Sequence, residues 1–172
     1  MRDQRFVAAH RGGPLSKEQH QQLMGWAADC AEHVLPLIAQ SDDRLQNILE
    51  TARAWARGEV PVGNAQKASL QAHALAREFV NPTGVAVARA VGQAVATAHM
   101  ADHSLGAALY ALRAVKATGK PIEPERIWQN EHLPLEFKDL VLSALEAERF
   151  KGMLQSKTKG AAHSRPGQIV GR

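Results

Sequence analysis

The 172-residue sequence is long enough to bury an independent core in one domain, and its 45% hydrophobic content is typical of a globular protein. Aromatic residues account for only 5%, so the core has to be built from small side chains packed at close range. A single cysteine, Cys30, excludes an intrachain disulfide and favours a reducing, cytoplasmic location. No membrane span is expected, because the most apolar stretch, residues 85–98, is too short and is interrupted by Arg89 and Gln93.

The positive charge is concentrated near the C-terminal end of the sequence. The formal net charge is +4, and residues 156–172 contain four basic residues and no acidic one, so residues 1–155 carry no net charge. A folded nucleic-acid-binding protein would carry its excess cations on one face of the fold. We therefore predict a basic disordered tail over residues 156–172 and no specific nucleic-acid partner. Weak, salt-sensitive attraction of that tail to RNA or anionic lipid is the alternative.

The first half of the chain predicts three amphipathic helices. Ser16 and Gln19 have the spacing of a capping box, and apolar residues then recur at helical intervals until Pro36. An aspartate at 42 or 43 caps the second helix, and Asn64 is the expected cap of the third. The expected ranges are 16–35, 43–57 and 65–79.

A long alanine-rich central helix is predicted over residues 83–118. Asn81 is its expected cap, and Pro82 occupies the first helical position. One narrow polar stripe of Arg89, Gln93 and Thr97 is surrounded by apolar and small residues, which places this helix in the bundle interior. Two glycines, at positions 92 and 106, weaken the case for one unbroken rod.

The predicted fold class is all-α. A short helix over residues 124–132 and a last helix after Pro134 complete the pattern, and no segment alternates for long enough to predict a strand. We expect a single-domain bundle of about six helices over residues 16–155, preceded by an N-terminal extension, residues 1–15.

The candidate metal ligands are His99, Asp102 and His103. The two histidines are four positions apart, so on a helix they lie one turn apart on the same face, and neutral imidazoles in that arrangement can share one zinc or iron ion. A complete site needs further ligands from other helices. For that role we consider His33 first, with Glu32, Asp29 and His73 as further candidates.

The favoured interpretation of the same histidines is structural. In a polar seam inside the bundle each imidazole would be hydrogen-bonded, because an unpaired buried group costs about 1–3 kcal/mol. Acid–base catalysis is a weaker alternative, since the only conceivable nucleophile beside a histidine is Cys30 near His33, and such a cysteine is more often a small core residue.

Arg53 and Arg57, one turn apart, are either an anion clamp or a solvated helix end, of which we favour the second.

Four segments of the sequence together resemble the bacterial immunity proteins that have an Imm-5-like domain. They are "FVAAHRGGPLSKEQHQQLMGWAADCAEHVLPL", "RAWARGE", "GQAVATAHMADHSLGAALYALRAV" and "ERIWQNEHLPLEFKDLVLSAL". The resemblance extends from about Phe6 to Arg149 and implies a small cytoplasmic protein that protects its producer by binding a cognate toxin. It supplies no catalytic residues and no cofactor.

Two hypotheses follow. In the first, the protein neutralises a cognate protein toxin by binding it, without catalysis, cofactor or membrane. If the toxin were a nuclease, its inhibitor would be expected to have an acidic surface. Residues 1–155 carry no net charge, so the sequence does not predict such a surface. In the second, it is a metal-binding helical protein or enzyme that uses zinc or iron at His99, Asp102 and His103. The oligomeric state is left open.

Overall fold

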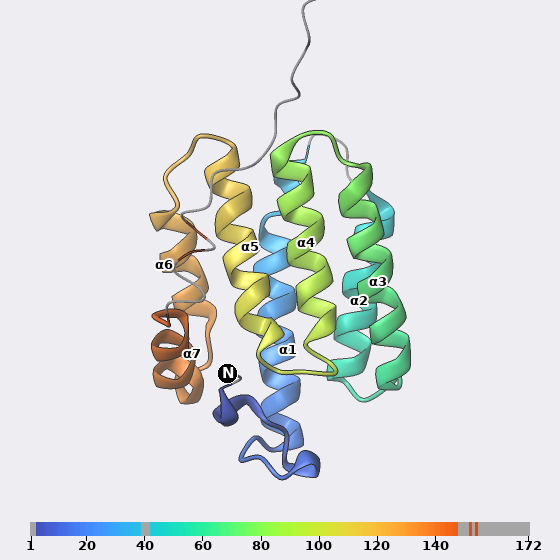
Figure 1. Ribbon diagram of the computed structural model, residues 1–172, viewed down its shortest axis with the longest axis vertical. Helices are drawn as coiled ribbons and strands as arrows, with labels where there is room; N and C mark the ends of the chain where they lie inside the picture. The colour runs from blue at the N-terminus through green and yellow to red at the C-terminus, as the bar shows by residue number, and fades with distance from the viewer. Residues whose placement is uncertain (1–2, 39–41, 148–151, 153, 155–172) are drawn as a thin grey trace, which may run out of the picture.

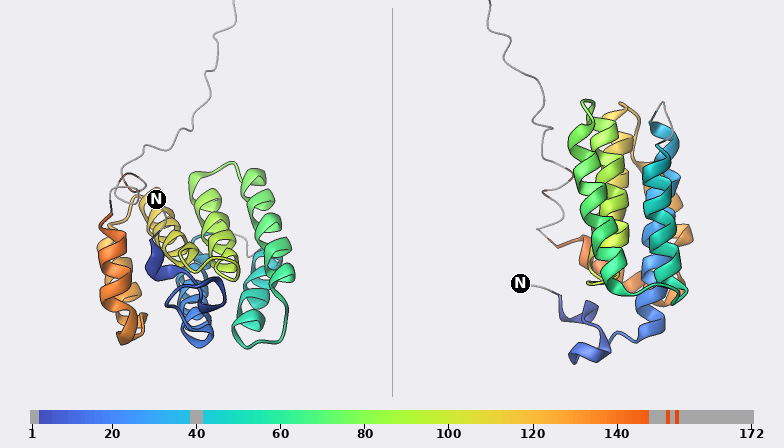
Figure 2. Two further views of the ribbon diagram at one scale, coloured as in Figure 1. Left: turned by 60° about the horizontal axis from the view of Figure 1, so that its bottom comes forward. Right: turned by 90° about the vertical axis from the view of Figure 1, so that its right-hand side faces the viewer.

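Two layers of antiparallel helices form the protein. The computed structural model describes residues 3–38, 42–147, 152 and 154, and within these it contains seven α-helices and no strand, which confirms the all-α prediction. The helices are α1 (Lys17–His33), α2 (Asp43–Ala56), α3 (Val62–Glu78), α4 (Pro82–Ala96), α5 (His103–Ala117), α6 (Glu123–His132) and α7 (Lys138–Leu145). Helices α3, α4 and α5 lie side by side in one layer, α1 and α2 lie behind them, and α6 and α7 flank α5 (Figures 1 and 2).

The centre of the bundle is α4. Ten of its fifteen residues are buried, and all ten are glycine, alanine or valine. Because such side chains are short, α3 and α5 can both pack closely against α4 while α1 and α2 cover its inner side. The scarcity of aromatic residues is thus matched by close contact between helix backbones.

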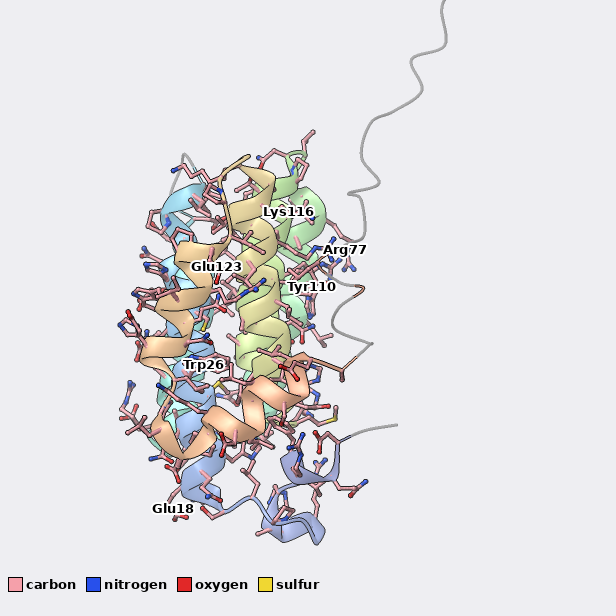
Figure 3. The ribbon with its side chains drawn as sticks, turned by 90° about the vertical axis from the view of Figure 1, so that its left-hand side faces the viewer. Glu18, Trp26, Arg77, Tyr110, Lys116 and Glu123 are labelled. Carbon is pink, nitrogen blue, oxygen red and sulfur yellow. The ribbon has the colours of Figure 1, made fainter. Side chains whose placement is uncertain are left out.

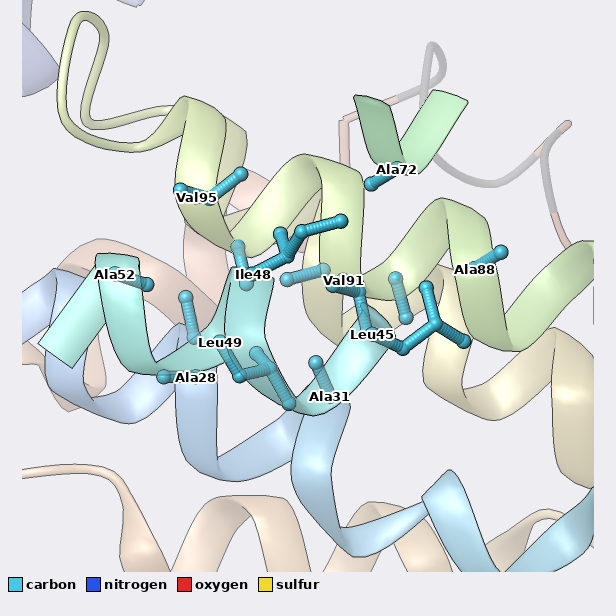
Figure 4. Packing of buried hydrophobic residues seen from close by; sticks show 14 of the residues in the cluster. Ala28, Ala31, Leu45, Ile48, Leu49, Ala52, Ala72, Ala88, Val91 and Val95 are labelled. Atoms are coloured by element: carbon cyan, nitrogen blue, oxygen red, sulfur yellow. The ribbon is translucent and has the colours of Figure 1, made fainter. Parts of the chain in front are cut away.

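Helix α2 packs its apolar stripe into the groove between α1 and α4. Figure 4 shows Leu45, Ile48 and Leu49 from α2 meeting alanines of α1 and valines of α4. These leucines and the isoleucine are buried, as their helical spacing predicts. Trp55, near the end of the same helix, is only partly buried and packs against the cluster.

Most of the predicted helix starts are confirmed. The Ser16 hydroxyl accepts from the backbone N–H of Gln19 at 3.1 Å, and the Gln19 side chain accepts from the backbone N–H of Ser16 at 3.0 Å, which completes the capping box. Asn81 caps α4 by accepting from the N–H of Gly84 at 2.6 Å. The prediction for α3 is wrong, because this helix begins earlier, with Pro61 in the N-cap position.

The predicted long central helix is wrong, and correcting it raises the helix count from six to seven. The chain reverses at residues 97–102, so that α4 and α5 are antiparallel neighbours (Figure 1). An unbroken helix over 83–118 would be about 54 Å long and could not bury its apolar surface along its whole length. The reversal contains no glycine or proline, which is why the sequence pattern did not reveal it.

The residues predicted as an N-terminal extension fold against one end of the bundle. Phe6 and Leu15 are buried in a cluster with Trp26 of α1 and Leu105 of α5. The turn that brings them there requires two glycines: Gly12 has a φ of 81°, and a Cβ at the next glycine would overlap the carbonyl oxygen of Val7. The predicted tail, residues 156–172, lies outside the described residues.

Glycines 92 and 106 do not break their helices but admit polar side chains from neighbouring helices. The ring of His73 lies on Gly92, and the amide of Gln93 lies on Gly106. A Cβ at Gly106 would stand 2.6 Å from Oε1 of Gln93, an atom that already accepts a hydrogen bond from His103 at 2.7 Å. Each glycine is therefore a packing requirement of the α3–α4–α5 layer.

We predict that Gly106→Ala lowers the free energy of unfolding by about 1–2 kcal/mol. The gain in helix propensity, about 1 kcal/mol, is smaller than the combined loss from overpacking and from displacing Gln93. Adding Gly106→Ala to Gln93→Ala should instead raise stability by about 1 kcal/mol, because the obstructing amide is gone. Urea denaturation measures both.

Gly25→Ala in α1 is the matched control for this prediction. A Cβ at Gly25 would meet nothing within 4 Å, so the substitution should stabilise the protein by about 1 kcal/mol. If Gly106→Ala stabilised the wild-type protein as much as Gly25→Ala, the packing argument would be wrong.

Candidate functional site

Three of the four predicted metal ligands lie together, and the fourth does not. His99 and Asp102 are in the turn between α4 and α5, and His103 is the first residue of α5. His33 is the last residue of α1, at the opposite end of the bundle from that turn (Figure 1). The structure therefore separates His33 from the histidine pair.

The histidines at the α4–α5 turn form a half-buried cluster. The ring centroids of His99 and His103 are 4.9 Å apart, and His20 of α1 reaches the same region. The cavity beside them has a volume of about 20 Å³, room for about one water molecule, and it is closed by Phe6 and other residues of the N-terminal segment. The described cavity that His99 lines is therefore small.

Two imidazoles of this cluster have defined hydrogen-bond partners. His20 donates through Nε2 to the carbonyl oxygen of Thr97 at 2.5 Å, and His103 donates through Nδ1 to Gln93 Oε1 at 2.7 Å. The Thr97 carbonyl lies where α4 ends, so His20 satisfies an acceptor that the helix itself leaves unpaired. These are the contacts expected of a polar seam.

A metal centre at this cluster stays a prediction. In the described part of the chain no group of three or more His, Cys, Asp or Glu side chains is placed to hold a metal ion. His20 of α1 lines the same small cavity as His99 and Asp102, but its Nε2 is hydrogen-bonded to the Thr97 carbonyl oxygen.

At the other end of the bundle, His33 belongs to a network built around the buried carboxylate of Glu125. His33 donates through Nδ1 to Glu125 Oε2 at 2.7 Å, and Gln129 Nε2 donates to Glu125 Oε1 at 2.9 Å. The imidazole of His33 is stacked on the indole of Trp128 at 3.8 Å, with the planes only 3° apart. Trp26 donates to the backbone oxygen of Gln129 at 3.0 Å, which caps an open carbonyl near the end of α6.

This network attaches α6 to the bundle. The Glu125 side chain is 5% exposed, and a carboxylate so buried is tolerated only when both oxygens have donors. Its donors come from α1 and α6, so the short α6 is tied to α1 by polar contacts. No sequence pattern singled out Glu125 as a buried carboxylate. Its spacing from Gln129, four residues apart on one helix face, was the only sequence feature that indicated a contact between the two side chains.

Cys30 is not a nucleophile in this arrangement. It is 0% exposed, and burial raises the pKa of its thiol well above the usual value, with the negative charge of Glu125 adding to the effect. A thiol with a raised pKa is protonated near neutral pH and unreactive. Cys30 is a small core residue, as the favoured interpretation expected.

The arginines of α2 are each paired with two carboxylates. Arg53 binds Asp29 at 2.9 Å and Glu32 at 2.5 Å. Arg57 binds Glu50 and Glu59, each at 2.7 Å. These pairings occupy both guanidinium groups of the conceivable anion clamp.

An open groove of about 460 Å³ lies between α2 and α3. Its polar lining includes Asn47, Thr51 and Gln71, and its only titratable group is Arg44, which pairs with Asp42 at 2.9 Å and Glu78 at 3.1 Å. The groove thus offers hydrogen-bonding side chains but no acid–base pair.

The fold and these pairings define a class: an all-α bundle protein whose buried polar groups serve packing and hydrogen bonding. A family model, Imm-5 like putative immunity protein, matches residues 13–136, and the chain belongs to this family. No curated protein and no solved structure matches the chain. Across the described residues, the helices fall short of the length and apolarity that crossing a membrane requires.

Two imidazoles in the bundle are held in the neutral form. Desolvation lowers the pKa of His20 below its ordinary value of 6.5. Desolvation, followed by the positive charges of Arg89 and Arg77, lowers the pKa of His73 in the same direction. Arg89 donates to Nδ1 of His73 at 3.0 Å, which requires an unprotonated acceptor nitrogen.

We predict that the free energy of unfolding falls as the pH drops below about 6.5. A histidine with a depressed pKa in the folded state binds its proton more readily when unfolded, so acid favours unfolding between the unfolded and folded pKa values. The double variant His20→Gln/His73→Gln should show a shallower slope between about pH 7 and about pH 5 in urea titrations. An unchanged slope would contradict the assignment.

Proposed function

We propose that this protein neutralises a cognate bacterial toxin by binding it, without catalysing a reaction. The observation that carries the proposal is membership in the Imm-5 like immunity family over residues 13–136. Binding alone suffices for such a role, because a partner that covers the active surface of a toxin stops it from reaching its substrate.

Three features of the structure support a binding role. The helices are packed through small side chains, which gives a rigid scaffold for a preformed surface. The buried polar side chains His20, Glu125 and Gln129 are used in internal hydrogen bonds. Cys30 is inert by burial. The chemistry of the described residues therefore favours recognition over reaction.

We place this action in the cytoplasm of the producing cell. The one cysteine of the chain is free and buried, which accords with a reducing compartment. A producer must neutralise its own toxin before the toxin reaches an intracellular target, and a small rigid bundle is suited to that task.

The test begins with a screen of the protein domains encoded beside this gene for one that arrests growth, and it asks whether this protein protects against that domain. Cells that express that domain alone should stop growing, and cells that co-express this protein should recover growth close to that of uninduced cells. The purified pair should form a complex in gel filtration, with a Kd of about 1 nM or lower, as tight inhibition requires. Failure of both rescue and complex formation would refute the proposed function.

Metal analysis separates this proposal from the metal-binding alternative. Protein purified without a polyhistidine tag should contain less than about one zinc or iron per ten chains, because a resident site needs three or four ligands. Stoichiometric metal that is lost in His103→Ala would favour the alternative. Toxin binding by metal-free protein would argue against it.

A further inference from the structure

The arginines of the two layers differ in how their charge is balanced. On α2, each of Arg44, Arg53 and Arg57 has two carboxylate partners. On the other layer, no carboxylate of the described residues forms an ion pair with Arg77, Arg89 or Arg113, which belong to α3, α4 and α5. Within the described residues, positive charge on this side of the bundle is therefore left without carboxylate partners.

The sequence of that layer explains the imbalance. Residues 79–122, which contain α4 and α5, include four basic residues and a single carboxylate. The carboxylate is Asp102, in the turn at one end of the layer. The one acidic residue of α3, Glu78, is paired with Arg44 of α2.

Side-chain contacts place these cations on one face. Arg89 of α4 reaches across to His73 of α3, with NH1 donating to Nδ1 at 3.0 Å. The guanidinium carbon of Arg113 lies 5.2 Å from the centre of the Tyr110 ring on α5. Figure 3 shows Arg77, Tyr110 and Lys116 on the same side of the bundle, away from Glu123 of α6. We call the surface formed by Arg77, Arg89, Tyr110, Arg113 and Lys116 the basic face.

An exposed leucine borders the basic face. Leu70 is 70% exposed and lies seven residues, about two helical turns, before Arg77, so both project from the same side of α3. Arginine, tyrosine and a neighbouring apolar side chain together resemble the composition of the positions that contribute most binding energy in protein–protein interfaces.

Two of the arginines are held in place before any partner binds. Arg89 is fixed by its hydrogen bond to His73, and Arg113 by its position over the ring of Tyr110. A guanidinium that is already positioned loses less conformational freedom when it binds a carboxylate, and its two N–H groups can donate to both carboxylate oxygens.

We propose that the basic face is the surface that binds the toxin, and that the toxin presents an acidic surface to it. This inference rests on the proposed function and adds to it the face of this protein and the chemistry of its partner. Opposite charges on the two surfaces speed association and select the correct partner.

The experiment measures the affinity of this protein for a catalytically inactive form of the growth-arresting domain found in the screen described under the proposed function. The test variant is Arg77→Glu/Arg113→Glu, and the matched control is Lys67→Glu/Arg126→Glu, which makes the same change in net charge. Lys67 is also on α3 but borders the hollow between α2 and α3, and Arg126 is on α6. Thermal unfolding verifies that each variant is folded. Arg77→Glu/Lys116→Glu replaces the test variant if the Arg113 substitution unfolds the protein.

We expect the test variant to weaken binding by about 30-fold or more, the size of an interface hot spot, and the control to weaken it by about 3-fold or less. Raising the salt from about 0.05 to about 0.3 M should slow association of the wild-type protein more than that of the test variant. Equal weakening by both variants would overturn the proposal, because it would reflect net charge alone. Wild-type affinity in the test variant would also overturn it while leaving the proposed function intact.

Two further outcomes also count against the inference. If a single-stranded poly(U) RNA bound the wild-type protein at physiological salt and lost affinity in the test variant, while toxin binding did not change, the face would belong to nucleic acid. If the wild-type protein formed no complex with the toxin domain, the proposed function would fail and this inference with it.

Discussion

The close approach of α3, α4 and α5 is the constraint on which the rest of the structure depends. Helix α4 has only glycine, alanine and valine among its buried residues, so its neighbours are limited by backbone contact rather than by side-chain length. Where a polar side chain must cross between helices, a glycine provides the space, as Gly92 does for His73 and Gly106 for Gln93.

The polar groups inside this bundle are used to join helices. His20 of α1 satisfies the Thr97 carbonyl where α4 ends, and the buried carboxylate of Glu125 receives hydrogen bonds from His33 and Gln129. A buried polar group without a partner would be costly, so each of these contacts favours one arrangement of the helices over alternatives. Two of the histidines considered as metal ligands, His103 and His33, hydrogen-bond to Gln93 and Glu125 at two separate ends of the bundle.

Charge organises the described surface of the bundle. Carboxylates and arginines neutralise each other on α2, whereas the outer side of the α3–α4–α5 layer keeps its cations without carboxylate partners among the described residues. A neutral protein body can therefore present a positive surface, a property that its net charge conceals. For a member of the Imm-5 like family, a rigid bundle with a polarised surface is consistent with recognition of a protein partner.

The sequence by itself determined the all-α class, the family, and the starts of α1, α2 and α4, because apolar periodicity and capping residues act within one or two helical turns. Only the tertiary structure decided that the predicted central helix folds back into α4 and α5. The imidazole of His20 binds the Thr97 carbonyl at that reversal, and the two residues are 77 positions apart in the sequence. Packing between helices likewise separates His33 from His103 and buries Glu125. It also brings Arg77, Arg89 and Arg113 to one face. Such contacts join residues far apart in sequence, and no local pattern encodes which distant side chains will meet.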